Sequence, residues 1–245
     1  MTSDSLAGSD LTLTEAVNIA GRQRMLTQRM VKAYCQIGVG VTPDASQSQL
    51  NGAVDLFEQQ LTTLEKQFAS HTQVSQELGI IRNTWDAFRT VVTRPVNKPH
   101  AQQIADTSDR LLASSNKVVG LLQDASGTEY ARLVNISGRQ RMLSQRAAKL
   151  YLLSVWGLDN PELRNDLMQT SDEFATALEQ LQSSTANTRT IAQQLREVND
   201  LWVSFASALN IEGSATFPLI VADASEKILQ HFEEITFLYQ TLSDQ

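Results

Sequence analysis

Two near-identical segments carry the chemistry that this sequence offers, and it is the chemistry of arginine. Residues 18–29 read Asn-Ile-Ala-Gly-Arg-Gln-Arg-Met-Leu-Thr-Gln-Arg, and residues 135–146 read Asn-Ile-Ser-Gly-Arg-Gln-Arg-Met-Leu-Ser-Gln-Arg. A guanidinium group keeps its charge at physiological pH and offers two parallel N–H donors to a flat oxyanion. Residues 16–43 and 130–158 contain no Asp or Glu, so these arginines have no carboxylate on their own segment.

The two segments belong to a duplication of the whole chain. They lie 117 residues apart, and 12 of the 17 positions from Asn18 to Tyr34 are identical at that offset. The same offset takes Phe57 to Phe174 and Trp85 to Trp202 without a gap. Internal repeats of this kind determine the architecture, so one structural unit is expected to occur twice.

Each unit is predicted to consist of four helices, because Gly and Pro are scarce and apolar residues recur at helical spacing. Short links favour antiparallel helices, so the expected fold is all-α, with two tandem four-helix up-down bundles related by pseudo-two-fold symmetry. The expected domains are residues 13–125 and 129–245. Thr42 and Asn160 each precede a proline and are expected to be N-caps, and residues 124–127 are the expected turn between the copies. The helices are expected near 13–38, 43–69, 73–93, 98–124, 129–156, 160–183, 187–210 and 215–243.

The helix that contains each motif has two faces that could be buried. One face is an ordinary core stripe, whereas the opposite face is apolar at both ends and has Gly, Arg and Gln in the middle. A glycine inside a helix costs about 1 kcal/mol relative to alanine, so Gly21 and Gly138 indicate close approach of another backbone. The expected packing places the two motif helices against each other and buries four small residues of this face. They are Val17, Val31, Val134 and Ala148.

That packing would bring Arg24 and Arg141 together with no carboxylate between them. Burying two unpaired guanidinium groups is costly, and an anion held between them would remove the cost. The candidate ligand-binding residues are Arg24, Arg141, Gly21, Gly138, Asn18, Asn135, Arg22, Arg139, Gln28 and Gln145. The alternative for the other basic residues of the motif helices is that each simply pairs with an acid on a neighbouring helix. These residues are Arg22, Arg29, Lys32, Arg139, Arg146 and Lys149.

The bulk composition excludes several classes of protein. The net charge is −7, and the basic segments lack aromatic platforms, so nucleic acid is not an expected partner. No apolar run approaches the ~18 residues of a membrane span. The three histidines are scattered, Cys35 has no histidine at helical distance, and no phosphate-binding loop or nucleophile motif occurs. We therefore expect no enzyme activity, no catalytic residue, no metal and no cofactor.

The motif resembles the signature helix of the PilJ-type sensor domain, which is also the sensor region of NarX-type nitrate and nitrite sensor kinases. The resemblance is specific over residues 15–38 and 132–156 and implies a symmetric pair of bundles with one nitrate between the signature helices. It implies contact of that ion with Arg24 and Arg141, beside Gly21 and Gly138. NarX-type motifs have a lysine directly after the asparagine. Ile19 and Ile136 stand there in this chain, as in the PilJ-type branch.

Two functional hypotheses follow. The first is a sensor that binds nitrate or nitrite between the two Arg-rich helices and signals to a downstream regulatory protein. The second is a ligand-free helical scaffold whose basic stripes bind an acidic partner. The resemblance implies a periplasmic location, with a free-standing sensor holding both halves of the dimer in one chain. A cytoplasmic location, or an excised fragment of a longer protein, is the alternative.

Overall fold

The computed structural model describes residues 11–209 and 217–243, and every regular element in this part of the chain is helical. The elements lie close to the expected ranges, and the first helix has the expected ends. The predicted helix ends at 210 and 215 lie outside the described residues. The elements are α1 (Leu13–Gly38), α2 (Pro43–Gln67), α3 (Thr72–Val92), α4 (Lys98–Ser126), α5 (Glu129–Leu153), the π-helical segment η1 (Ser154–Leu158), α6 (Pro161–Gln182), α7 (Arg189–Leu209) and α8 (Phe217–Ser243).

Side-chain caps define where several helices begin. Thr12 forms a capping box with Glu15 at the start of α1, and the Thr128 hydroxyl accepts from the backbone N–H of Ala131 at the start of α5. Asn160 caps α6 as predicted, since its side chain accepts from the backbone N–H of Leu163 at 2.8 Å. Thr42 stands at the N-cap position of α2 ahead of Pro43, as predicted, but it has φ 38° and its side chain accepts no capping hydrogen bond.

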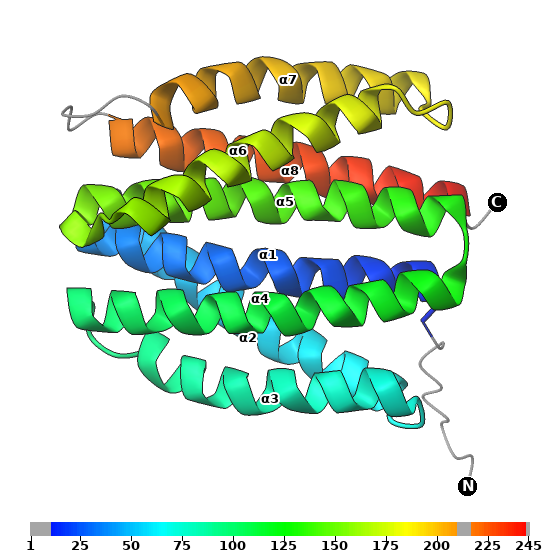
Figure 1. Cartoon of the computed structure of the whole chain (residues 1–245), viewed down its shortest axis with the longest axis horizontal. Helices are drawn as coiled ribbons and strands as arrows, with labels where there is room; N and C mark the ends of the chain where they lie inside the picture. Colours follow the sequence, from blue (N-terminus) through cyan, green and yellow to red (C-terminus); the bar gives the residue numbers. More distant parts are fainter. Residues whose placement is uncertain (1–10, 210–216, 244–245) are drawn as a thin grey trace, which may run out of the picture.

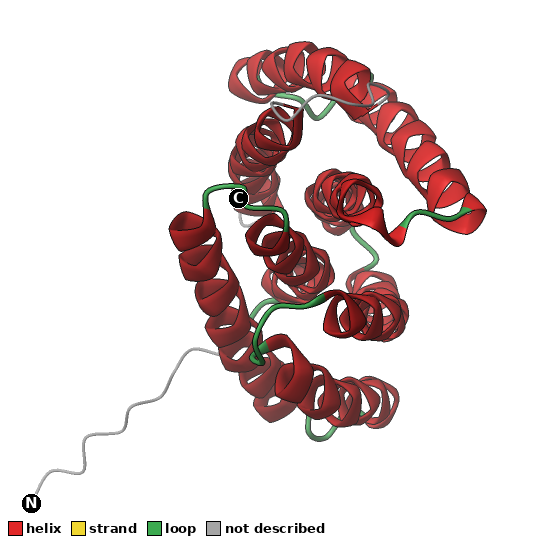
Figure 2. Cartoon of the chain, turned by 90° about the vertical axis from the view of Figure 1, so that its left-hand side faces the viewer, coloured by secondary structure: helices red, strands yellow, loops and turns green. Residues whose placement is uncertain are grey.

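The helices form two bundles that meet along α1 and α5. Figure 1 shows α1 and α5 side by side in the middle, with α2, α3 and α4 below them and α6, α7 and α8 above. In the view turned by 90°, most helices run toward the viewer and the two groups are stacked (Figure 2). The chain passes along α1 and α5 in the same direction, as a two-fold axis parallel to the helices requires (Figure 1).

The turn between the two copies is shorter than predicted. Helix α4 continues to Ser126, and only residues 127 and 128 connect it to α5. Gly127 has φ 63°, a left-handed conformation that ends the helix at almost no steric cost in glycine. Because the connection is so short, α4 and α5 are antiparallel neighbours, and α5 returns alongside α1.

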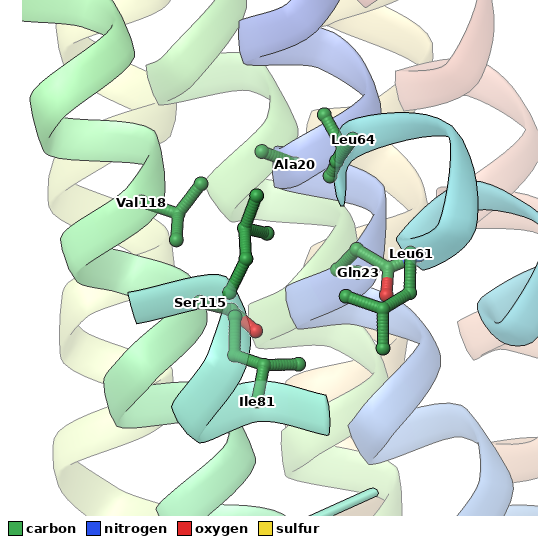
Figure 3. Close-up of a pocket in the computed structure, with 8 residues that line it drawn as sticks. Ala20, Gln23, Leu61, Leu64, Ile81, Ser115 and Val118 are labelled. Carbon is green, nitrogen blue, oxygen red and sulfur yellow. The ribbon is translucent and has the colours of Figure 1, made fainter. Parts of the chain in front are cut away.

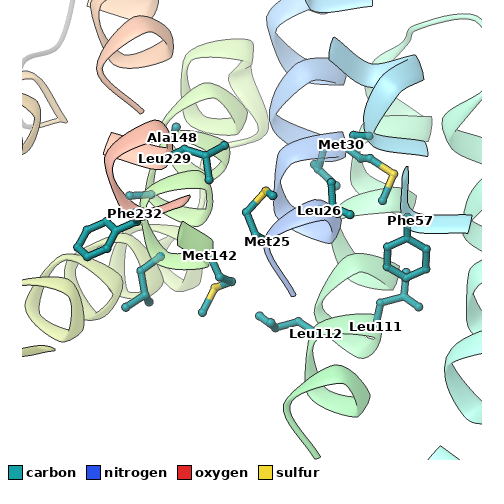
Figure 4. Packing of buried hydrophobic residues seen from close by; sticks show 14 of the residues in the cluster. Met25, Leu26, Met30, Phe57, Leu111, Leu112, Met142, Ala148, Leu229 and Phe232 are labelled. Atoms are coloured by element: carbon teal, nitrogen blue, oxygen red, sulfur yellow. The ribbon is translucent and has the colours of Figure 1, made fainter. Parts of the chain in front are cut away.

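Apolar side chains from both bundles form one continuous core. Figure 4 shows Leu26, Met30 and Phe57 grouped in the first bundle, and Leu229 and Phe232 in the second. The four residues predicted to pack between the motif helices are all buried, namely Val17, Val31, Val134 and Ala148. Each motif helix is therefore covered on two faces, one by its own bundle and one by the other copy.

Candidate anion-binding site between the two copies

The structure brings Arg24 of α1 and Arg141 of α5 to the contact between the two copies. The two side chains are 2% and 0% exposed. A Cβ atom added at Gly138 would lie 3.0 Å from Nη2 of Arg141 and 3.6 Å from Nη2 of Arg24. At Gly21 the distances are 3.3 Å to Arg24 and 3.5 Å to Arg141. Both guanidinium groups therefore lie over both glycines, which supply the space for them.

Arg141 has a carboxylate partner, which corrects the prediction that neither arginine has one. Its Nη1 donates to Oε2 of Glu233 on α8 at 2.8 Å, and its Nη2 donates to the side-chain oxygen of Asn18 at 2.8 Å. Burial lowers the pKa of Arg141, while the charge of Glu233 opposes that shift. The carboxyl group of Glu233 remains ionised, because Arg141 and Arg22 outweigh its burial and lower its pKa to about 2.

Within the described part of the chain, the hydrogen-bond partners of Arg24 are neutral. Its Nη1 donates to the side-chain oxygen of Asn116 on α4, and its Nη2 donates to the backbone oxygen of Asn135, both at 3.3 Å. Among the described residues no carboxylate lies within ion-pair distance of Arg24. Burial and the like charges of Arg141 and Arg139 lower the pKa of Arg24 to about 9, so the group is still charged at neutral pH.

The Nε–H group of each arginine adds to this incomplete pairing. The Nε atoms of Arg24 and Arg141 are buried, and neither donates a hydrogen bond within the described part of the chain. A buried N–H group without an acceptor costs about 1–3 kcal/mol. The contact between the copies thus contains an unpaired donor on each arginine as well as an unpaired side-chain oxygen on Asn135, and the charge that lacks a carboxylate partner among the described residues is that of Arg24.

The predicted asparagines lie at the site, whereas the predicted glutamines do not contact it. Asn18 accepts from Arg141, and Asn135 offers its backbone oxygen to Arg24. Gln28 donates to the hydroxyl of Thr27, and Gln145 donates to the backbone oxygen of Ser225. In the residues that the structure describes, no hydrogen bond joins either glutamine to Arg24 or Arg141.

Four further arginines of the motif form ion pairs, as the structural alternative predicted. Arg22 pairs with Glu233 at 2.5 Å, and Arg139 pairs with Glu173 at 2.7 Å. Arg29 pairs with Glu226 at 2.5 Å. Arg146 pairs with Asp109 and Asp166 at 2.8 and 2.9 Å. The side chain of Arg139 is 47% exposed and is paired with Glu173 of α6, although its charge still acts on Arg24.

The sequence analysis missed the acids of the fourth helices, Asp109 and Glu226. They stand 117 residues apart, so the duplication offered a signal that could have identified them as equivalent. Lys149 pairs with Asp109 at 3.0 Å, and Lys32 pairs with Glu226 at 2.5 Å. Each pair joins the motif helix of one copy to the last helix of the other. Each motif helix is therefore joined by an ion pair to the bundle of the other copy, at equivalent positions in the two copies.

A narrow pocket inside the first bundle lies apart from this site. It is lined by eight residues, among them Gln23, Ser115 and Val118, and Figure 3 shows their side chains around it. It is too narrow for a water molecule. In the second copy Phe232 stands at the position of Ser115, and Phe232 is fully buried. The pocket is a packing gap created by the smaller residue.

The described residues give little support for a metal site, a reactive thiol or a membrane span. They contain no group of three or more His, Cys, Asp or Glu side chains that could hold a metal ion. The Cys35 thiol is buried, and burial raises its pKa to about 12, as suits a packing residue. No helix in the described ranges is long and apolar enough to cross a membrane.

Fold and site together define a duplicated helical-bundle module with paired buried arginines at its centre. Comparison with known protein families matches residues 9–113, and again residues 125–227, to PilJ, the type IV pili methyl-accepting chemotaxis transducer N-terminal region. The chain therefore belongs to this family and carries two tandem copies of its domain. Membership makes the chain a sensor module of a signalling system. Comparisons with curated proteins and with solved structures found no match.

Proposed function

We propose that this sensor module binds one small oxyanion, nitrate or nitrite, between Arg24 and Arg141. The observation that carries the proposal is the buried Arg24, which lies beside a second arginine and has no carboxylate partner among the described residues. A buried charge without a counter-ion is strongly unfavourable, so a protein that retains one has a use for it. An anion beside Arg24 would restore the charge balance.

The donors at this contact suit a flat oxyanion. Guanidinium groups from two opposite helices offer N–H donors in two planes, and each retains an Nε–H group that donates to no acceptor in the described chain. Nitrate and nitrite place their oxygens in one plane and are small enough for a contact between helices. Gly21 and Gly138 leave the room that the two guanidinium groups occupy, and so bring both sets of donors to one place.

Binding would act as a change in population. The anion offsets the repulsion between Arg24 and Arg141, so it favours the arrangement in which α1 and α5 are closest. Residues 13–125 and 129–245, the two proposed domains, would then shift relative to each other at the helix ends. A downstream signalling protein would detect that shift. Membership of a chemotaxis-transducer family supports such a partner and a periplasmic location.

The alternative, a scaffold whose basic stripes bind an acidic partner helix, fits the burial less well. Arg24 and Arg141 are 2% and 0% exposed, so an acidic helix could reach them only by separating α1 from α5. The remaining arginines of the motif already pair with acids of this chain.

The test is the melting temperature of the protein during titration with nitrate, nitrite, sulfate and chloride. A ligand at about 100 times its dissociation constant should stabilise the folded state by about 2.7 kcal/mol. We expect nitrate or nitrite to raise the melting temperature, and Arg24→Gln and Arg141→Gln to abolish the rise. Arg164→Gln is the matched control, because Arg164 is 62% exposed and, within the ranges that the structure describes, its ion pair is with Asp159.

Two results would contradict the proposal. One is a wild-type melting temperature that none of the small oxyanions changes. The other is a nitrate response of equal size in wild type, Arg24→Gln and Arg141→Gln. Arg24→Gln is not expected to prevent folding, because it removes a buried charge that has no carboxylate partner in the described chain.

A further inference from the structure

The two halves of the site differ at one pair of equivalent positions. Asn116 on α4 and Glu233 on α8 lie 117 residues apart and therefore correspond in the duplication. Each side chain accepts a hydrogen bond from Nη1 of the buried arginine of its own copy, Asn116 from Arg24 at 3.3 Å and Glu233 from Arg141 at 2.8 Å. The position that binds the arginine is thus an amide in one copy and a carboxylate in the other.

This difference sets the charge of the site. Glu233 is ionised across the physiological range, since neighbouring arginines hold its pKa near 2. The two buried arginines and Glu233 together carry one net positive charge, and Arg22, the second partner of Glu233, lies at the edge of this group with 27% of its side chain exposed, where solvent screens its charge. A single negative charge would neutralise this group, whereas a doubly charged ion would leave an uncompensated negative charge in a buried place beside a carboxylate.

The difference also distinguishes the two sides of the site. Glu233 is held by Arg22 as well as by Arg141, so on its side both guanidinium groups already have a carboxylate partner, although the Glu233 side chain is itself 31% exposed. Asn116 is exposed on the surface of α4, although the Arg24 guanidinium to which it is bonded is buried. On this side the Arg24 guanidinium therefore meets a neutral, exposed side chain in place of a carboxylate.

We infer that Glu233 is a built-in counter-ion that makes the site selective for singly charged anions and directs them to the Arg24 side. This inference rests on the proposed function, which it makes more specific. Glu233 neutralises Arg141 permanently, and Asn116 leaves Arg24 available. A symmetric site with asparagine in both places would have one more positive charge and would accept a doubly charged oxyanion.

The test exchanges the two residues. Glu233→Asn, Asn116→Glu and the double exchange are compared with wild type by calorimetric titration with nitrate, perchlorate and sulfate. Perchlorate and sulfate are both tetrahedral and differ in charge, so their ratio separates charge from shape. Gln103→Glu is the matched control, because it adds one negative charge to an exposed position of α4 several turns away.

We expect Asn116→Glu to weaken nitrate binding by at least roughly tenfold, since a carboxylate would neutralise the remaining arginine. Glu233→Asn should raise the affinity for sulfate relative to the singly charged ions by at least roughly tenfold. The double exchange should recover nitrate binding, because the site again contains one carboxylate, now beside Arg24 instead of Arg141. Gln103→Glu should leave every affinity near that of wild type.

The outcomes separate the two proposals. Wild type that binds none of the three ions, nor nitrite in a parallel titration, contradicts the proposed function and this inference together. Wild type that binds nitrate, with the same nitrate affinity in Asn116→Glu and an unchanged preference in Glu233→Asn, overturns only the inference. Since Asn116 is at the surface, the Asn116→Glu protein is expected to fold. A loss of nitrate binding in this variant would therefore report on the anion site and not on misfolding.

Discussion

Lys32 and Glu226 form an ion pair of 2.5 Å that joins α1 of the first copy to α8 of the second. The lysine is fully buried, and its pKa is lowered to about 8 by that burial, with Glu226 acting against the shift. Lys149 and Asp109 form the equivalent pair between α5 and α4 at 3.0 Å. The two copies are thus held together by buried charges as well as by their apolar core.

Removal of the Glu226 carboxylate should be costly. Glu226→Gln leaves Lys32 and Arg29 without their common partner, and breaking a buried pair in this way costs about 3–5 kcal/mol. Urea denaturation should show that loss. Asp223→Asn is the control, since Asp223 pairs with Lys227 on the surface, where about 0–1 kcal/mol is expected. Equal effects of the two substitutions would contradict the assigned role.

Glu233 should make the protein sensitive to acid in a defined range. Its folded pKa is about 2, below the ordinary value of 4.5, so it contributes stability that is complete above pH 4.5 and is lost as the pH falls toward 2. The loss should be about 2 kcal/mol after allowance for its partial exposure. Unfolding free energies of wild type and Glu233→Gln, measured between pH 5 and 2, should converge. Glu234→Gln is the control, and curves for Glu233→Gln that run parallel to wild type would refute the prediction.

Gly138→Ala should raise the thermal stability less than the replacement of a glycine that has open space around it. Alanine favours a helix over glycine by about 1 kcal/mol, but the new Cβ would lie 3.0 Å from Nη2 of Arg141. Gly79→Ala meets nothing within 4 Å and should show the full gain in thermal stability. Gly138→Ala should gain less and should reduce the nitrate-dependent rise in melting temperature. A full gain with an unchanged nitrate response would show that the glycine does not make room for the arginines.

Ser115→Ala should stabilise the first bundle. The hydroxyl of Ser115 is buried and has no hydrogen-bond partner among the described residues, so its removal should raise the unfolding free energy by about 1 kcal/mol. Ser108→Ala, on the same helix, removes a buried hydroxyl that is bonded to Ala105 and Lys149 and should destabilise by a similar amount. Thermal denaturation compares them, and a destabilised Ser115→Ala would mean that this hydroxyl is satisfied in solution.

The architecture could be read from the sequence because the duplication is ungapped and its helices are long. The offset of 117 residues aligns the motif with its copy, and few glycines and prolines interrupt the periodic segments. Thr42 shows the limit of such local signals. Its place before a proline is typical of an N-cap, yet the chain enters α2 with Thr42 at φ 38° and leaves no side-chain cap.

The buried arginine pair could also be predicted, since a glycine inside an acid-free helix indicates close packing and a repeated helix offers the partner. Arg24 and Arg141 meet over Gly21 and Gly138, as that argument requires. The counter-ion of Arg141 could not be predicted in the same way. Glu233 lies 92 residues from Arg141 along the chain, and nothing in the local pattern of α8 relates the two.

The sequence by itself determined that one helical unit occurs twice and that each copy carries an arginine with no acid nearby in the chain. Only the tertiary structure decided which of those arginines is neutralised. Helix spacing sets what lies on one face, but charge compensation depends on side chains that other helices bring within a few ångströms. In the folded chain the Glu233 carboxylate accepts a hydrogen bond from Arg141, whereas the equivalent acceptor for Arg24 is the Asn116 amide. Two nearly identical motifs therefore have different electrostatic surroundings.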